Sequence, residues 1–180
     1  TVVIADLDTG VDYTHVDLAA NMWHNTAEVH DNGIDDDGNG WVDDYYGVDT
    51  CYGDGDPWDD NGHGTHTSGT IAAAGDNDMG VTGVSWSTKV MALKFLDAGG
   101  YGSDSAAIDA IYYIIDQKVN HGVNVVAINA SWGGGGYNEV LEQAIKDAGD
   151  AGIIFVAAAG NSGLDVDANA NYPSGYDVPT

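Results

Sequence analysis

The chain has 180 residues, 43% of them hydrophobic, which is enough to bury the core of one domain. It carries 29 acidic residues against four basic ones, and its formal net charge is −25. A surface with this charge repels nucleic acid and anionic lipid, so we expect neither nucleic acid nor a membrane as a partner.

The first predicted element is a buried strand at residues 2–5, in an apolar run that continues to Leu7. Because the chain opens directly into this strand, we expect a mature or trimmed form whose signal peptide has been removed. Residues 28–62 are rich in Gly, Asp and Asn. They form a loop too long for a simple connection, so we expect a ligand to organise them.

The acidic insert, residues 28–60, contains no lysine or arginine. Three explanations of the acidity of the whole chain are open: metal ligation, a surface adapted to high salt, and solubility. We favour a mixture, because the acidic residues are clustered as well as numerous. The single cysteine, Cys51, also lies here. It is either a free thiol or the partner of a cysteine outside the chain.

Helices and strands alternate after the insert. We predict helices at 63–74, 103–120 and 138–148, and strands at 90–96, 123–129 and 153–158. In the helix at 103–120 isoleucines recur at helical spacing, Ser103 is the expected N-cap, and Gly122 ends the helix. Strands buried on both faces that alternate with helices indicate one α/β domain. Its central, mostly parallel sheet would be flanked by helices in three layers.

Polar or glycine-rich segments follow three of the strands, at residues 8–10, 129–134 and 157–163. In a parallel sheet the carboxyl ends of the strands meet at one edge, where ligands and chemistry gather. A single aspartate such as Asp8 is equally typical of a simple turn at such a place. Asp8 at this edge of the sheet therefore indicates a functional site only when other segments support it.

The segment at residues 61–70 contains two histidines, His63 and His66. Their spacing suits two zinc ligands on one helix face, but the segment lacks the glutamate of a metalloprotease helix. Glycines on both sides of His63 indicate a close approach of backbone or substrate. A positioned histidine beside an aspartate such as Asp8 is the acid–base half of a nucleophilic triad.

Four segments resemble the successive signature blocks of the subtilase family. They are residues 8–10 (Asp-Thr-Gly), 63–66 (His-Gly-Thr-His), 131–134 (Ser-Trp-Gly-Gly) and 159–163 (Ala-Gly-Asn-Ser-Gly), in the order and spacing of the family. The resemblance covers nearly the whole chain. It implies that residues 1–180 are part of a subtilisin-like catalytic domain, with the C-terminal part absent and no second domain.

The resemblance implies a secreted serine endopeptidase that acts on proteins and peptides. His63 would be the general base, Asp8 would orient its ring, Asn161 would donate to the oxyanion, and His66 would be structural. The walls of the S1 pocket would come from Ser131, Trp132, Gly133, Ala158 and Gly160. Extended substrate would pair with Gly100, Tyr101 and Gly102.

The resemblance also implies calcium. Asp17 is similar to the family's aspartate ligand for a tightly bound Ca²⁺. The rest of the shell would come from the Asn77 side chain and from loop carbonyls at Gly75, Met79 and Val81. A solvated acidic turn is the alternative for this loop.

Two further groups of acidic residues are candidate metal sites. The first group follows the pattern of an EF-hand loop counted from Asp35. Residues with side-chain oxygens stand at positions 1, 3, 5 and 9, and these are Asp35, Asp37, Asn39 and Asp43. Gly40 stands at position 6. Position 12 is Tyr46 instead of a glutamate, so the EF-hand is incomplete. The second group, just before His63, is Asp54, Asp56 and Asp59, with Asp60 beside them.

The family's nucleophilic serine lies in a Gly-Thr-Ser-x-Ala block, and the chain contains no such block. Ser68 belongs to the histidine helix and is not expected to replace it. We therefore expect that either the polypeptide is truncated or nicked, and its C-terminal remainder with the serine is a separate chain, or this is a naturally shortened form. The alternatives are a catalytically dead binding or inhibitory fragment and a calcium-dependent structural module. The structural module leaves the glycine-rich settings of His63 and Asn161 unexplained.

Overall fold

The computed structural model describes residues 1–178, in which a five-stranded sheet forms the central layer. Its strands are β1 (Val3–Asp8), β2 (Gly47–Asp49), β3 (Lys89–Lys94), β4 (Val125–Ala130) and β5 (Ile154–Ala157). They lie in the order β2-β3-β1-β4-β5, and every neighbouring pair is parallel. The predicted parallel α/β sheet is confirmed.

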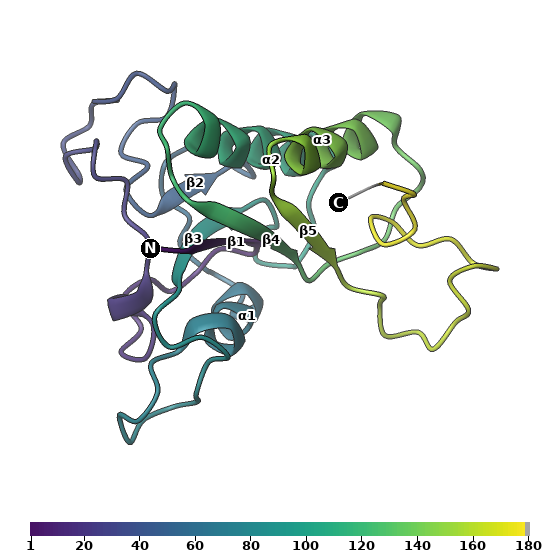
Figure 1. Cartoon of the computed structure of the whole chain (residues 1–180), viewed down its shortest axis with the longest axis horizontal. Helices are drawn as coiled ribbons and strands as arrows, with labels where there is room; N and C mark the ends of the chain where they lie inside the picture. The colour runs from purple at the N-terminus through teal and green to yellow at the C-terminus, as the bar shows by residue number, and fades with distance from the viewer. Residues whose placement is uncertain (179–180) are drawn as a thin grey trace.

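Helices form the two outer layers. They are α1 (His63–Ala72), α2 (Asp104–Val119) and α3 (Glu139–Asp150), with a short 3₁₀ helix, η1 (Ala19–Asn21). The helices α2 and α3 lie side by side on one face of the sheet and α1 lies on the other (Figure 1). Ser103 caps α2 as predicted, because its Oγ accepts a hydrogen bond from the Ala106 amide. The three-layer architecture is thus confirmed.

The larger part of the core lies between the sheet and the helices α2 and α3. Leu7 and Ile128 from the sheet meet Ile111 and Ile145 from the helices, and all four are at most 1% exposed. A smaller cluster under α1 includes Val11, Leu18, Met22, Ala72 and Val90. Strand β3 contributes to both clusters, with Met91 and Leu93 in the larger and Val90 and Ala92 in the smaller, which explains its nearly continuous apolar sequence.

Sequence patterns missed two elements. Strand β2 lies inside the insert predicted to be irregular, and η1 lies between β1 and the insert. Gly47 begins β2 so close to β3 that a Cβ there would lie 1.8 Å from the Ala92 carbonyl oxygen. A three-residue strand fixed by such a contact is too short to show a periodic pattern.

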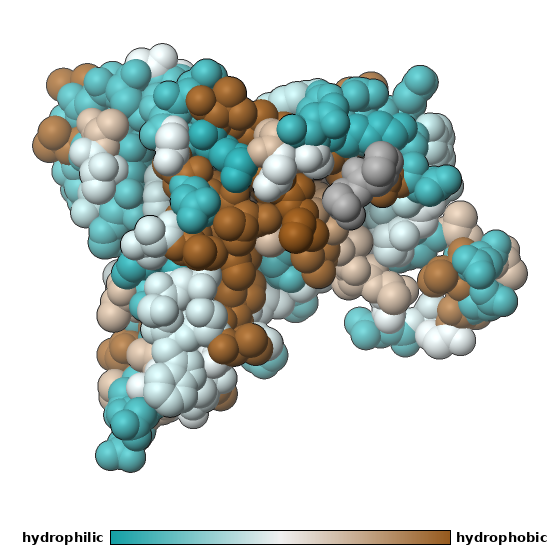
Figure 2. Space-filling view, in the orientation of Figure 1, coloured by the Kyte–Doolittle hydropathy of each residue, from teal (hydrophilic) through white to brown (hydrophobic). Residues whose placement is uncertain are grey.

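The α1 layer covers only part of its face of the sheet. Helix α1 contacts β1 and β3, whereas Ile154 and Val156 on the edge strand β5 are 55% and 52% exposed. Figure 2 shows hydrophobic side chains gathered over the middle of the molecule, where Figure 1 places the strands. No helix within residues 1–178 is long and apolar enough to cross a membrane.

Candidate active site

Asp8 and His63 form a hydrogen-bonded pair at the carboxyl edge of the sheet. Asp8 is the last residue of β1 and His63 is the first residue of α1. His63 Nδ1 lies 2.7 Å from Asp8 Oδ1 and 2.9 Å from Oδ2. Asp8 is fully buried, whereas half of the His63 side chain is exposed. A carboxylate that holds Nδ1–H leaves Nε2 as a proton acceptor facing the accessible side of the ring.

The surroundings of Asp8 act on its pKa in opposite directions. Burial raises the pKa of the Asp8 carboxyl, and the hydrogen bonds from His63 and from the Thr9 amide oppose that rise. The net result is a raised pKa. Asp8 therefore depends on His63 and Thr9 to stay ionised in a site closed to water.

Two glycines let the start of α1 approach the turn after β1. Gly10 has φ +98°, and a Cβ there would lie 2.4 Å from the Pro57 carbonyl oxygen. A Cβ on Gly64 would lie 2.1 Å from the Gly10 carbonyl oxygen. The glycine after His63 thus serves a close backbone approach, which is one of the two reasons proposed for it from the sequence.

Asp59 holds the N-terminus of α1, and this corrects its assignment as a metal ligand. Its buried carboxylate accepts hydrogen bonds from the backbone amides of Asn61, Gly62 and Thr65 and from the hydroxyls of Thr65 and Thr9. Burial acts to raise the Asp59 pKa, but these hydrogen bonds outweigh it and lower the pKa. With five donors around it, the carboxylate is occupied as a helix cap.

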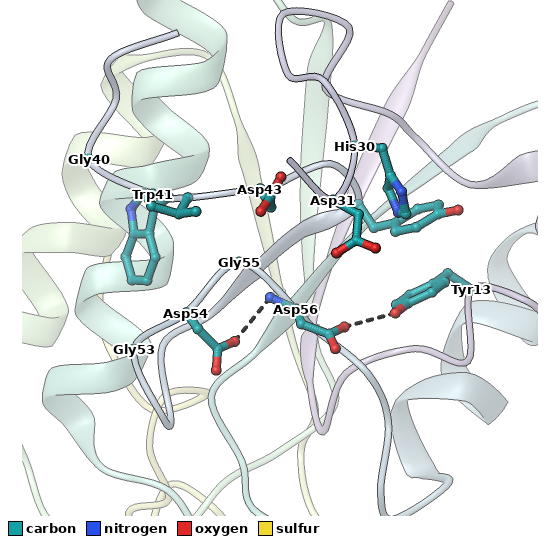
Figure 3. A pocket seen from close by; sticks show the side chains of 12 residues that line it. Tyr13, His30, Asp31, Gly40, Trp41, Asp43, Gly53, Asp54, Gly55 and Asp56 are labelled. Atoms are coloured by element: carbon teal, nitrogen blue, oxygen red, sulfur yellow. Dashed lines mark hydrogen bonds between the residues drawn. The ribbon is translucent and has the colours of Figure 1, made fainter. Parts of the chain in front are cut away.

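Asp54 and Asp56, expected to share a metal site with Asp59, lie apart from it. They line a cavity of about 540 Å³, together with Asp43 and aromatic residues (Figure 3). Asp56 accepts a hydrogen bond from the Tyr13 hydroxyl, and Asp54 accepts one from the Asp56 amide. The predicted group of three is therefore wrong, because its carboxylates point to different partners.

Lys94 is a buried residue of the site that sequence reasoning missed. At 2% exposure, its Nζ donates to the carbonyl oxygens of Thr9 and Leu96 and to Asp60 Oδ1, at 2.9, 2.8 and 2.7 Å. It joins the end of β3 to the turn that follows Asp8. A lysine in a predicted buried strand was the one available signal, because lysine is almost never fully buried without partners.

Asp6 forms a second buried aspartate two residues before Asp8. It is 0% exposed and accepts hydrogen bonds from the Ser68 and Thr67 hydroxyls of α1 and from Asn129 Nδ2 of β4. The Ser68 hydroxyl is thus engaged inside the protein, in agreement with the expectation that Ser68 is not a nucleophile. Sequence analysis did not single out Asp6.

His66 lies one turn after His63 on α1, and its side chain is exposed. It lines a separate cavity with Asp17 and Val81. An exposed side chain contributes little to packing, so burial gives no support to the expected structural role of His66.

The segments predicted to form the S1 pocket meet around one cavity. Its volume is about 380 Å³, and its lining includes Ser131, Trp132, Gly133, Ala158, Gly160 and Asn161. The first three follow β4 and the others follow β5. The structure thus brings the predicted oxyanion donor and both predicted walls to one place.

The predicted substrate-pairing segment lies on the other side of Trp132. A neighbouring cavity of about 390 Å³ is lined by Gly100, Tyr101 and Gly102 together with Trp132 and Gly133. Tyr101 is 77% exposed at its rim. Packing of the Phe95 and Trp132 rings, with centroids 4.7 Å apart, joins this cavity to the end of β3.

Asp17 and the loop at residues 75–81, the predicted calcium ligands, lie against each other. Asn77 Nδ2 lies 2.6 Å from Asp17 Oδ1, and the Val81 amide donates to Asp17 Oδ2 at 2.9 Å. A Cβ on Gly80 would lie 2.2 Å from Asp17 Oδ2, so the loop folds tightly over this carboxylate. Gly75 packs against the Trp86 ring, and Met79 is exposed. Both Asp17 oxygens accept N–H donors from this loop, so calcium binding here stays a prediction.

The EF-hand pattern does not assemble as predicted. Asp35 accepts hydrogen bonds from the amides of Gly38, Asn39 and Gly40, and Asp43 accepts them from Asn32 and Gly33. Asp37 converges instead with Glu28 and Asp44, two residues that the pattern does not contain. Asp35 and Asp43 therefore shape turns by side-chain to backbone bonds, as Asp commonly does in loops.

Comparison with known proteins gives the same family throughout. A family model described as "Subtilase family" matches residues 1–179. Subtilisin-like protease 1 of Plasmodium berghei is 38% identical over 97% of this chain and 30% of its own length. Thermitase of Thermoactinomyces vulgaris is 34% identical over 96% of this chain and 51% of its own. The solved structure of Sphericase superposes with a TM-score of 0.73 at 30% identity, over 91% of this chain and 47% of that one. The chain thus spans about half the length of these relatives or less.

Proposed function

The chain belongs to the subtilase family of serine proteases, and from this premise we propose that it carries part of the catalytic machinery of a secreted, calcium-binding serine endopeptidase. The observation that supports this most directly is the His63–Asp8 pair, with Nδ1 held at 2.7 Å and the rest of the ring accessible. Secretion enters the proposal only through the resemblance of the sequence motifs to the family.

In the proposed reaction, His63 Nε2 takes the proton of a serine hydroxyl as the oxygen attacks the scissile carbonyl carbon. His63 then gives this proton to the leaving amine. Asp8 keeps Nδ1–H oriented throughout and stabilises the imidazolium ion in between. Because Asp8 is closed to water, its charge acts on His63 at full strength during this step.

Asn161 would stabilise the negative charge that develops on the carbonyl oxygen. It follows β5 and lines the cavity that also holds Ser131 and Gly133, so a substrate side chain in that cavity would place its carbonyl nearby. Peptide backbone on either side would extend along the groove of Tyr101 and Gly133. The proposed substrates are therefore proteins and peptides in extended conformation.

Calcium belongs to the proposal through Asp17 and Asn77. Asp17 is 3% exposed, and the loop at residues 75–81 brings an amide side chain and backbone to its two oxygens. A bound Ca²⁺ would supply positive charge that ties this loop to the segment between β1 and η1. The residues that follow α1 would then be fixed to the strand that carries Asp8.

The test uses the complete protease. We expect His63→Ala to lower kcat on the order of 10⁶-fold, the loss measured for the corresponding change in subtilisin, without unfolding the protein. His66→Ala is the matched control, and because His66 is exposed it should leave kcat within about twofold. Peptide turnover and labelling by a serine-directed phosphonate report both results. Unchanged turnover in a folded His63→Ala protein, or a complete protein that neither turns over nor labels, would refute the proposal.

A further inference from the structure

Three carboxylates of the acidic insert converge away from the active site. Glu28, Asp37 and Asp44 each place an oxygen atom within 4.8 Å of the other two. Glu28 is 6% exposed, Asp44 is fully buried, and the Asp37 side chain is 5% exposed. Like charges this close, and shielded from water, repel one another strongly unless a proton or a cation compensates them.

One buried oxygen of this group has no partner. Glu28 Oε1 accepts hydrogen bonds from the Asp36 and Asp37 amides at 2.9 and 3.1 Å. Glu28 Oε2 is equally closed to solvent and accepts none within residues 1–178. Buried anionic oxygens are nearly always paired, so this atom indicates a ligand that brings positive charge to the cluster.

The protein offers almost no side chain that would supply this charge. Its basic residues are four lysines, and each Nζ is bonded elsewhere: Lys89 to Ala20, Lys94 to Thr9, Lys118 to Val125 and Lys146 to Glu142. His121 Nδ1 lies 3.8 Å from Asp37 Oδ2, beyond hydrogen-bonding distance, and its Nε2 lies 3.2 Å from Asp116. A protonated His121 would compensate one charge of the three.

Two asparagines donate hydrogen bonds to the cluster. Asn25 Nδ2 donates to both Asp37 and Asp44, and Asn39 Nδ2 donates to Asp44. Their side-chain oxygens accept hydrogen bonds from the Ala27 and Trp41 amides, so both asparagines act here as donors to the carboxylates.

We propose that Glu28, Asp37 and Asp44 bind a divalent cation, calcium, at a site distinct from the Asp17 loop. The three ligand groups are carboxylates, and their hard oxygen atoms suit calcium and disfavour soft metals. The Tyr113 hydroxyl donates to Asp44 Oδ2 at 2.6 Å, so the site would fix the insert to the buried side of α2. The proposal does not depend on peptidase activity.

Terbium luminescence and calcium titration test the site directly. Tb³⁺ occupies calcium sites and emits when a nearby aromatic ring is excited, and Tyr113 is in hydrogen-bond contact with Asp44. We expect ring-excited emission that Ca²⁺ abolishes by competition, in about 0.5 M NaCl so that diffuse binding to the acidic surface is screened. Asp17→Asn should retain this emission, because the Asp17 loop is a separate site.

Glu28→Gln removes the unpartnered charge at nearly constant shape, and we expect it to raise the Kd for calcium at this site at least about tenfold. Asp31→Asn is the matched control, because it removes one charge from the same insert at an exposed residue. Its φ of 61° suits asparagine equally well, so the Kd should change less than about twofold. Asp37→Asn repeats the test if Glu28→Gln does not fold. Unchanged calcium affinity in a folded Glu28→Gln or Asp37→Asn protein would overturn the proposal. Equal weakening by Asp31→Asn would do the same.

Discussion

Asp6 and Asp8 stand two residues apart on β1 and face the same helix, yet their surroundings give them different properties. Asp8 is paired with a histidine that can carry positive charge. Asp6 meets only neutral donors, from Ser68, Thr67 and Asn129. Burial, and after it the charge of Asp8, raises the pKa of Asp6 from 3.8 to about 6, and the three hydrogen bonds offset only part of the rise.

This difference predicts a pH dependence of stability that Asp6→Asn removes. A carboxyl whose pKa is raised on folding stabilises the folded state most below its unfolded pKa, and loses that contribution as pH rises through its folded pKa. Between pH 3.8 and about 6 the original protein should therefore lose up to about 3 kcal/mol relative to Asp6→Asn. Urea unfolding of both proteins across this range measures the difference. Parallel stability curves would contradict the assignment of the shift to Asp6.

The same contrast explains which site residues the sequence predicts. Asp8 and His63 stand in short signature blocks, so a local pattern identifies them. Other residues of the site have partners far away in the sequence, at separations of 34 to 123 positions. Asp6 is bonded to Asn129, Lys94 to Asp60, and Asp59 to Thr9. No local pattern records such contacts. The cluster of Glu28, Asp37 and Asp44 was missed for the same reason, because the EF-hand spacing assigns neighbours in sequence instead of neighbours in space.

At the scale of elements, the position of α1 depends on its first turn. The helix has an N-cap glycine in the left-handed region and no acidic residue in its first turn. Asp59 supplies the missing cap from three residues before Gly62, and it also receives the Thr9 hydroxyl. The same carboxylate therefore fixes the start of α1 and the turn after Asp8, which sets the distance between Asp8 and His63.

Asp59→Ala should destabilise the protein by at least about 2 kcal/mol, because it removes a cap and leaves buried donors without a partner. Burial acts to raise the Asp59 pKa, but the hydrogen bonds outweigh it, and the net result is a lowered pKa. The stability lost in Asp59→Ala should therefore be full at neutral pH and should shrink as the pH falls through the lowered pKa of Asp59. Asp109→Ala removes the same charge from an exposed position on α2 and should cost under about 0.5 kcal/mol. Denaturant midpoints at pH 7 and at a pH well below 3.8 compare the two variants. Equal losses in both variants would show that Asp59 is no cap.

Long elements were predictable and the insert was not. Helix α2 is predicted by isoleucines at helical spacing and by the Ser103 cap. Its predicted and observed bounds therefore agree within two residues at each end. The insert at 28–60 contains turns held by aspartate side chains and one short strand, β2. Its conformation depends on which carboxylate meets which amide, and composition does not determine those pairings.

At the scale of the whole molecule, one side of the sheet is incomplete as a hydrophobic layer. Ile153 and Phe155 point toward the cluster under α2 and α3, whereas Ile154 and Val156 are exposed on the opposite face. Among residues 1–178, β5 also pairs with β4 alone, so one of its edges is free within that range. Relatives of about twice the length match over this region, and we expect their additional residues to correspond to elements that cover this face and edge.

The same consideration predicts that residues 1–180 alone do not hydrolyse peptides. Catalysis requires an attacking oxygen beside His63 Nε2, and within residues 1–178 no serine hydroxyl is hydrogen-bonded to His63. Ser68, the serine nearest in the helix, is turned inward to Asp6. Without a serine nucleophile, the attacking group would have to be water. The His63–Asp8 pair alone accelerates attack by water only a little.

The measurement uses the 180-residue chain, confirmed as one polypeptide by intact mass, with a chromogenic peptide and a serine-directed phosphonate. We expect no turnover and no label, and activity on addition of a C-terminal remainder that carries a Gly-Thr-Ser-x-Ala segment. Restoration should fail with a His63→Ala chain, because the added serine would lack its base, and should succeed with His66→Ala. Turnover at enzymatic rates by the chain alone, with the phosphonate on one of its own serines, would mean that the nucleophile lies within the chain. The prediction that Asp8 and His63 lie in this chain and the serine in a C-terminal remainder would then be wrong.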